Sequence, residues 1–167
     1  MALTVEDGSI VTGANSYVSL AAARSYAAAR GATVPAADAD LEVMIIKAMD
    51  YLESHRDQFL GDSVERDQPL SFPRSGVVIE GWEWSKTEIP RHVISAQLAV
   101  LLEVAAGIDP YNPPLASQPV IKERVEGAVE LAYASPSAGG MKVSKDREAD
   151  VLLRLLLKRS GLFAIRA

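Results

Sequence analysis

Few residues in this chain have the types and spacing that catalysis requires. The sequence has two histidines, His55 and His92, and no cysteine. A zinc site needs several His or Cys ligands at short spacing, and general acid–base catalysis needs a pocket and an oriented partner. We therefore interpret both histidines as solvated residues near helix ends, and we expect neither a metal ligand nor a catalytic residue.

The other groups with possible chemistry have simpler explanations. Asp38, Asp40 and Glu42 form an acidic cluster. The cluster lacks the loop glycine and the terminal bidentate glutamate of a calcium site, so helix capping accounts for it. Neither GxGxxG nor GxxxxGK[ST] occurs, and the pair Gly139-Gly140 is too isolated to bind a phosphate group. We expect no cofactor and no enzymatic activity.

Trp82 and Trp84 are two residues apart, so they lie on the same face of a predicted strand. Large aromatic side chains are mostly buried, and packing on the local core is the simpler interpretation. The alternative is contact with a partner subunit, because aromatic residues are enriched at interface hot spots. Stacking on single-stranded nucleic acid normally needs a cationic groove, whereas Glu80, Glu83 and Glu88 flank these tryptophans.

The composition indicates an acidic globular protein. The chain has 167 residues, 49% of them hydrophobic, and a formal net charge of −5. This charge disfavours sequence-independent binding of nucleic acid, which depends on Lys and Arg, and only the C-terminal quarter is locally basic. No apolar stretch reaches the roughly 18 to 20 residues that cross a bilayer, and the first residues lack a signal-peptide pattern. We expect synthesis in the cytoplasm and no contact with membranes.

Apolar periodicity and helix-end signals predict a mainly α fold, a small bundle of about four helices. Ser19 is expected to cap the first helix and Gly31 to end it, while Asp38 and Asp40 are expected to cap the second. Pro90 suits the first position of the third helix. The four predicted helices span residues 20–30, 39–58, 90–106 and 146–159.

Alternating residues predict two pairs of short strands. Residues 77–79 and 82–84 would turn at Glu80-Gly81, and a second hairpin would span about 120–133 with its turn at Glu126-Gly127. Prolines stiffen the connector that precedes the second hairpin. We expect one domain over residues 1–160, followed by an extended tail over 161–167.

The last predicted helix is apolar around most of its circumference, whereas a surface helix normally has an apolar stripe about 100° wide. A central core helix is the simpler interpretation. The alternative is a helix shared with a neighbouring subunit, with Val151 and Leu155 as interface candidates, and the third helix is similarly apolar. The apolar residues are Val151, Leu152, Leu153, Leu155, Leu156 and Leu157.

Several segments, in this order, resemble a family of tailed-phage and prophage proteins often described as DnaT-like and single-stranded-DNA-binding. They are also similar to the head–tail adaptor, or head-completion, proteins of long-tailed phages. The segments are Val5–Gly8, Ala14–Ser19, Ala28–Gly31, Ala48–Leu52, Gln68–Gly76, Glu88–Arg91, Ala96–Gln97 and Ile121–Tyr133.

The adaptor resemblance implies a ring, about twelve-fold, in the neck of the virion between portal and tail. The implied partners are the portal protein, neighbouring adaptor subunits and a tail-completion or terminator ring, with genomic DNA passing through unbound. Leu162, Phe163, Ile165 and Arg166 would form a tail that orders when it docks on the portal. The hairpin, together with the loop that carries Gly139 and Gly140, would form a second interface.

Two other functions stay open at this point. One is a DnaT-like accessory protein that binds single-stranded DNA, with an affinity that falls steeply as salt rises. The other is a different neck or tail-completion protein, which the sequence does not separate from an adaptor.

Overall fold

The structure is a computed structural model, and it describes residues 2–112, 120–125, 129–133 and 147–158. The chain divides into two compact units. One, which we call the helical unit, comprises residues 1–112 and 147–167, and the other, the hairpin unit, comprises residues 113–146. The predicted single domain over residues 1–160 stays a prediction.

Helix α1, Leu20–Ala29, begins where the sequence predicts and ends one residue earlier, with Arg30 as its cap residue. The Ser19 hydroxyl accepts a hydrogen bond from the backbone N–H of Ala22, at 3.2 Å. Gly31 follows the helix with a φ of +64°, the left-handed conformation that commonly ends helices.

Helix α2, Asp38–Glu53, is shorter than the predicted 39–58. Ser54 is its C-terminal cap residue and donates its hydroxyl to the carbonyl oxygen of Tyr51, and the 3-10 helix η1, Arg56–Gln58, follows. The expected capping by Asp38 and Asp40 is wrong, because the cap residue is Ala37 and no side chain caps this end. Both carboxylates lie in the first turn, where the helix dipole favours negative charge.

Helix α3, Arg91–Ala105, is preceded by Pro90 as its cap residue rather than including it. Most of the apolar face of this helix is buried inside its own chain, which leaves little apolar area for a neighbouring subunit to cover. Its buried residues are Val93, Ala96, Gln97, Leu98, Ala99, Val100 and Leu101.

Helix α4, Glu148–Leu153, is much shorter than the predicted 146–159. Beyond it the backbone pairs with the segment after α2. The N–H of Leu60 donates to the carbonyl of Leu156 at 2.8 Å, and the N–H of Lys158 donates to the carbonyl of Gln58 at 2.7 Å. A continuous helix would not allow this pairing, and apolar periodicity does not reveal it.

The leucines around α4 are mostly covered by the helical unit itself. Leu153 and Leu156 are 1% and 0% exposed, whereas Val151 and Leu155 are 47% and 43% exposed. The core interpretation of this segment is therefore confirmed for its buried leucines. Among the described residues of this segment, Val151 and Leu155 are the large apolar side chains exposed enough for a partner to cover.

In the described parts of the chain, the strands form three two-stranded antiparallel sheets. Strand β3, Val78–Ile79, pairs with β4, Trp82–Glu83, as predicted, and the turn residues Glu80 and Gly81 have φ values of +54° and +86°. The predicted hairpin is confirmed as β5, Val120–Val125, paired with β6, Val129–Tyr133. Its turn residues lie outside the described residues. The third sheet, β1 (Asp62–Ser63) with β2 (Arg74–Ser75), was not predicted.

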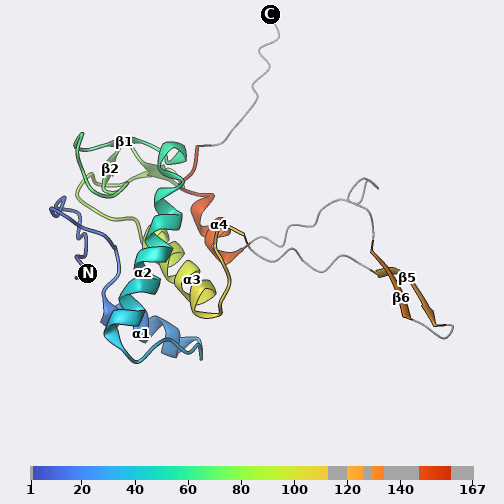
Figure 1. The fold of residues 1–167 in the computed structure, drawn as a ribbon. Coiled ribbons are helices and arrows are strands. Elements are labelled where there is room, and N and C mark those ends of the chain that lie inside the picture. The colour runs from blue at the N-terminus through green and yellow to red at the C-terminus, as the bar shows by residue number, and fades with distance from the viewer. Residues whose placement is uncertain (1, 113–119, 126–128, 134–146, 159–167) are drawn as a thin grey trace, which may run out of the picture. The chain divides into compact units, whose positions relative to one another are not determined.

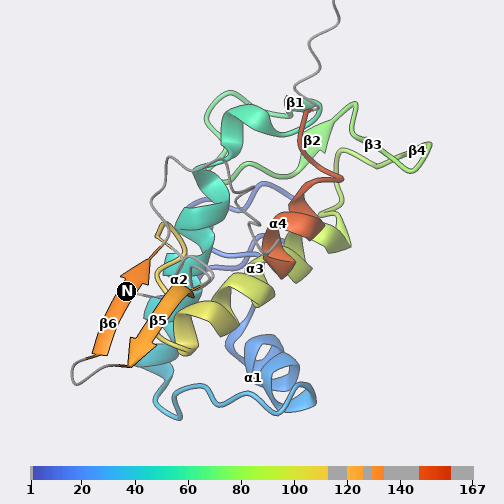
Figure 2. The same cartoon turned by 90° about the vertical axis from the view of Figure 1, so that its right-hand side faces the viewer.

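The architecture of the helical unit is mainly α, as predicted. Helices α2 and α3 lie alongside each other, α4 packs on α3, and α1 contacts α2 and α3 (Figure 1). Figure 2 shows the short strands β1 to β4 gathered near the N-terminal end of α3. Within the described ranges, no helix is long and apolar enough to span a membrane.

Candidate functional site

Gln68 organises the irregular segment between η1 and β2. Its side chain is 4% exposed. The Nε2 atom donates to the carbonyl oxygens of Leu70, Ser71 and Pro73 at 2.7, 3.1 and 3.1 Å. The Oε1 atom accepts from the backbone N–H groups of Val64 and Glu65 at 2.8 and 3.1 Å. One side chain thus satisfies five backbone groups that no regular element pairs.

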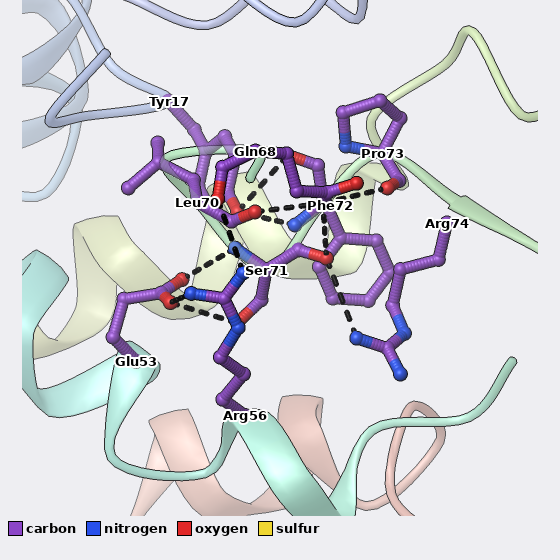
Figure 3. A network of polar contacts seen from close by, with 9 residues as sticks. All are labelled: Tyr17, Glu53, Arg56, Gln68, Leu70, Ser71, Phe72, Pro73 and Arg74. Atoms are coloured by element: carbon purple, nitrogen blue, oxygen red, sulfur yellow. Dashed lines mark hydrogen bonds and ion pairs between the residues drawn. The ribbon is translucent and has the colours of Figure 1, made fainter. Parts of the chain in front are cut away.

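The same segment is tied to α2 and to the N-terminal region (Figure 3). The Glu53 carboxylate accepts the N–H and the hydroxyl of Ser71 at 2.8 and 2.9 Å. The N–H of Phe72 donates to the Tyr17 hydroxyl at 2.8 Å. Burial raises the pKa of Tyr17 well above its ordinary value, and the charge of Glu53 adds to the effect. These contacts hold three distant parts of the chain together.

Glu6 has a comparable role in the N-terminal loop. Its carboxylate is 3% exposed and accepts the N–H groups of Gly8, Ile10 and Val11 at 2.8, 2.9 and 2.8 Å. Ile10 has a φ of +61°, which is uncommon for a β-branched residue, and the hydrogen bond to Glu6 holds it there. The carboxylate therefore fixes the loop.

Gln97 connects α3 to the rest of the core. Its side chain is 1% exposed and accepts the N–H of Tyr17 at 3.0 Å. Its Nε2 atom donates to the Ser16 hydroxyl at 2.9 Å and to the carbonyl of Ile45 in α2 at 3.3 Å. A buried amide with all these partners fixes the register of α3 against its neighbours.

A second cluster lies where the chain leaves and re-enters the helical unit. Arg147 donates to the carbonyl oxygen of Pro110 at 2.7 Å and forms an ion pair with Glu103. Its guanidinium lies over the ring of Tyr51, 4.8 Å from the centroid. The Tyr51 hydroxyl donates to Asp150 at 2.9 Å. Burial alone would lower the pKa of Arg147, but the hydrogen bond and charge of Glu103 outweigh it and raise the pKa.

A protein-family model described as "Putative DnaT-like ssDNA binding protein" matches residues 1–167, the full length of the chain. The chain belongs to this family. The description names a binding function and no reaction. No curated protein and no solved structure matches the chain.

The family segments of this DnaT-like protein build the fold. Glu6, Tyr17, Gln68, Arg74 and Gln97 all lie in segments that carry the resemblance, and all are less than 9% exposed. Arg74, for example, donates to the carbonyl oxygens of Leu60 and Gly61 at 2.8 and 2.7 Å, which fixes the turn before β1. The sequence pattern alone does not identify these buried polar residues as structural determinants, because Tyr17 and Gln97, for example, have partners that are distant in the chain. They face the interior, so they do not form a DNA-binding site.

The predicted interface residues fall into three groups. Trp82 is 75% exposed, so its packing on the core is excluded, whereas Trp84 is partly buried against the core. Val151 and Leu155 are exposed at α4. Gly139, Gly140 and the tail residues Leu162, Phe163, Ile165 and Arg166 lie outside the described residues.

Both histidines differ from the solvated residues that the sequence predicts. His55 is partly buried, its Nδ1 atom lies 3.0 Å from the carbonyl oxygen of Tyr51, and the two rings meet edge to face at 5.0 Å. The Nδ1 atom of His92 is buried with no hydrogen-bond partner among the described residues. Among all the residues that the structure describes, no group of three or more His, Cys, Asp and Glu side chains is placed to hold a metal ion.

Proposed function

We propose that this DnaT-like protein is an assembly subunit that binds other protein chains, as a ring-forming adaptor between the portal and the tail of a phage. The expected partners are the portal protein, neighbouring copies and a tail-completion ring, with DNA passing through the lumen. The similarity of the quoted segments to head–tail adaptors supports this proposal.

The observation that carries the proposal is the hairpin of β5 and β6. An isolated two-stranded hairpin is at best marginally stable in water. Within the described residues β5 and β6 pair only with each other. A hairpin of this kind gains stability when a partner strand or surface covers it. A neighbouring protein chain would supply that cover.

The distribution of charge also favours protein partners over DNA. Residues 1–112 contain 16 acidic and 8 basic residues. A body of this charge repels phosphate groups, which suits the wall of a conduit along which DNA slides without sticking. The exposed Val151 and Leu155 add a small apolar contact area on the same helical unit.

The tail provides a direct test. Deleting residues 161–167 should leave a folded protein that no longer co-sediments with assembled portal rings. A matched variant with Leu162, Phe163 and Ile165 changed to serine keeps the length of the tail and should show the same loss. Normal co-sedimentation of both variants would contradict the docking of this tail.

A second candidate function is binding of single-stranded DNA, which the description of the family supports directly. Residues 113–167 contain 9 of the 17 basic residues, so this part of the chain would supply the phosphate contacts. The test is fluorescence polarisation with a labelled oligonucleotide at low and at physiological salt. Saturable binding that weakens steeply with salt would favour this function, and no binding at either salt would exclude it.

A further inference from the structure

The hairpin of β3 and β4 and the first turn of α3 enclose an open groove of about 420 Å³. Trp82 and Trp84 line it, together with three glutamates and His92. The backbone of the hairpin turn is fixed in the left-handed region at Glu80 and Gly81, so Trp82 is held on a short, well-defined strand. This groove belongs entirely to the helical unit.

The groove combines negative charge with an exposed aromatic surface. The side chains of Glu80, Glu83 and Glu88 make no ion pair and no hydrogen bond within the described part of the chain. Arg91 is the one basic side chain in the lining. Trp82 is 75% exposed, more than any other large hydrophobic side chain described. Exposure of an indole ring to water is unfavourable in free energy, and a ligand that covers the ring removes this unfavourable contribution.

We propose that this groove binds a segment of a partner protein that carries arginine or lysine next to an apolar side chain. A cation placed over the face of Trp82 is attracted by the ring, and tryptophan is the aromatic residue that does this best. The neighbouring carboxylates accept charge-assisted hydrogen bonds from the same cation. The adjacent apolar side chain covers the rest of the indole. The proposal stands independently of the ring adaptor function.

Other occupants match the groove less well. A nucleic acid would place phosphates beside the carboxylates of Glu80, Glu83 and Glu88, and their repulsion opposes the gain from stacking on Trp82. A purely apolar helix would bury these carboxylates without partners, which costs several kcal/mol for an ion. A cationic segment pairs with the carboxylates and also makes a favourable contact with the indole ring.

The two tryptophans of the chain, Trp82 and Trp84, both line the groove, so intrinsic fluorescence reports on its occupancy. The probe is an acetylated and amidated pentapeptide of alternating arginine and leucine, titrated into the full chain. We expect a saturable change in fluorescence that weakens as salt rises. A peptide with glutamate in place of arginine should give no change.

Variants of the lining residues test whether the peptide binds in this groove. Their affinities are measured by calorimetry, because the substitution at Trp82 removes part of the tryptophan fluorescence. Trp82→Ala should weaken the affinity about ten-fold, the effect of losing one cation–π contact of typical strength. The double change Glu80→Gln and Glu83→Gln should weaken it further and reduce its salt dependence. Glu65→Gln, an exposed acid away from the groove, is the matched control and should change nothing.

The proposal is overturned if the pentapeptide does not bind, or if binding is the same in Trp82→Ala and in the double glutamine variant. A peptide of residues 158–167 of this chain serves as a further arm, because it also carries arginine and apolar side chains. If that peptide bound the groove while the arginine–leucine peptide did not, the occupant would be a second copy, and the partner proposed here would be wrong.

Discussion

The guanidinium of Arg147 donates a hydrogen bond of 2.7 Å to the carbonyl oxygen of Pro110. Pro110 lies just before the segment 113–146 and Arg147 lies just after it. This hydrogen bond therefore holds together, within the helical unit, the two points where the segment begins and ends. The ion pair with Glu103 and the ring of Tyr51 hold Arg147 in place. The helical unit is therefore closed at this point, and the hairpin unit is an insertion into it.

Replacing residues 113–146 by a six-residue Gly-Ser linker should leave the helical unit folded, because the core residues that the structure describes all lie outside the insertion. Thermal unfolding followed by circular dichroism should show one cooperative transition. Adding Arg147→Ala to this variant should lower the free energy of unfolding by about 2–3 kcal/mol, because Glu103 then loses its partner. A linker variant without a cooperative transition would contradict the insertion model.

Gln68→Ala should destabilise the protein by about 3 kcal/mol or more, since four backbone groups lose their partner, and the carbonyl of Ser71 keeps only a long contact with Arg74. Gln58→Ala is the matched control, because this exposed side chain makes no hydrogen bond in the described residues. Urea unfolding of both variants measures the difference. Equal midpoints would show that Gln68 is not the residue that holds this segment.

Local signals in the sequence were sufficient for much of the fold. Ser19 and Gly31 mark the two ends of α1, and alternating residues with Gly81 predicted the β3–β4 hairpin. These features depend on residues within one turn or one hairpin of each other, so a short window contains the necessary information.

Long-range contacts account for what could not be predicted. The short length of α4 follows from the pairing of residues 156–158 with 58–60, about a hundred positions away. Leu153 and Val151 are both apolar, yet Leu153 is buried and Val151 is exposed. The packing of α4 against α3 determines which of the two side chains is covered. The amino-acid composition likewise does not predict that Trp82 is exposed.

Helix α4 and the residues just after it offer a comparison between buried and exposed apolar side chains. Leu156→Ala should lower the free energy of unfolding by about 2–5 kcal/mol, because it leaves a cavity in a fully buried site. Val151→Ser with Leu155→Ser should change stability by less than about 1 kcal/mol, since both side chains are exposed. If the serine variant nevertheless bound its assembly partners normally, Val151 and Leu155 would not be interface residues.

The raised pKa of Tyr51 predicts that the protein loses stability in alkaline solution. Burial, followed by the hydrogen bond and charge of Asp150, raises the pKa of Tyr51 to about 12. In the unfolded chain tyrosine ionises near pH 10, so between about pH 10 and 12 the unfolded state releases its proton first. Stability that is fully present below pH 10 is therefore lost as the pH rises through this window.

Tyr51→Phe isolates this effect from other titrating groups. The stability advantage of the unmodified protein over Tyr51→Phe should shrink by roughly 1–2 kcal/mol between pH 10 and 12, allowing for partial solvent screening. Urea unfolding at pH 9, 10, 11 and 12 gives the two curves. A constant difference across this range would show that Tyr51 has an ordinary pKa.

The central claim is that this DnaT-like protein works by assembling with other protein chains. Electron microscopy of the protein mixed with its proposed partner, a phage portal protein, tests it most directly. We predict an additional ring of density stacked on the portal, with a rotational symmetry close to twelve-fold. Portal rings that look the same with and without the protein, at concentrations where it saturates a single-stranded oligonucleotide, would contradict the claim and favour DNA binding.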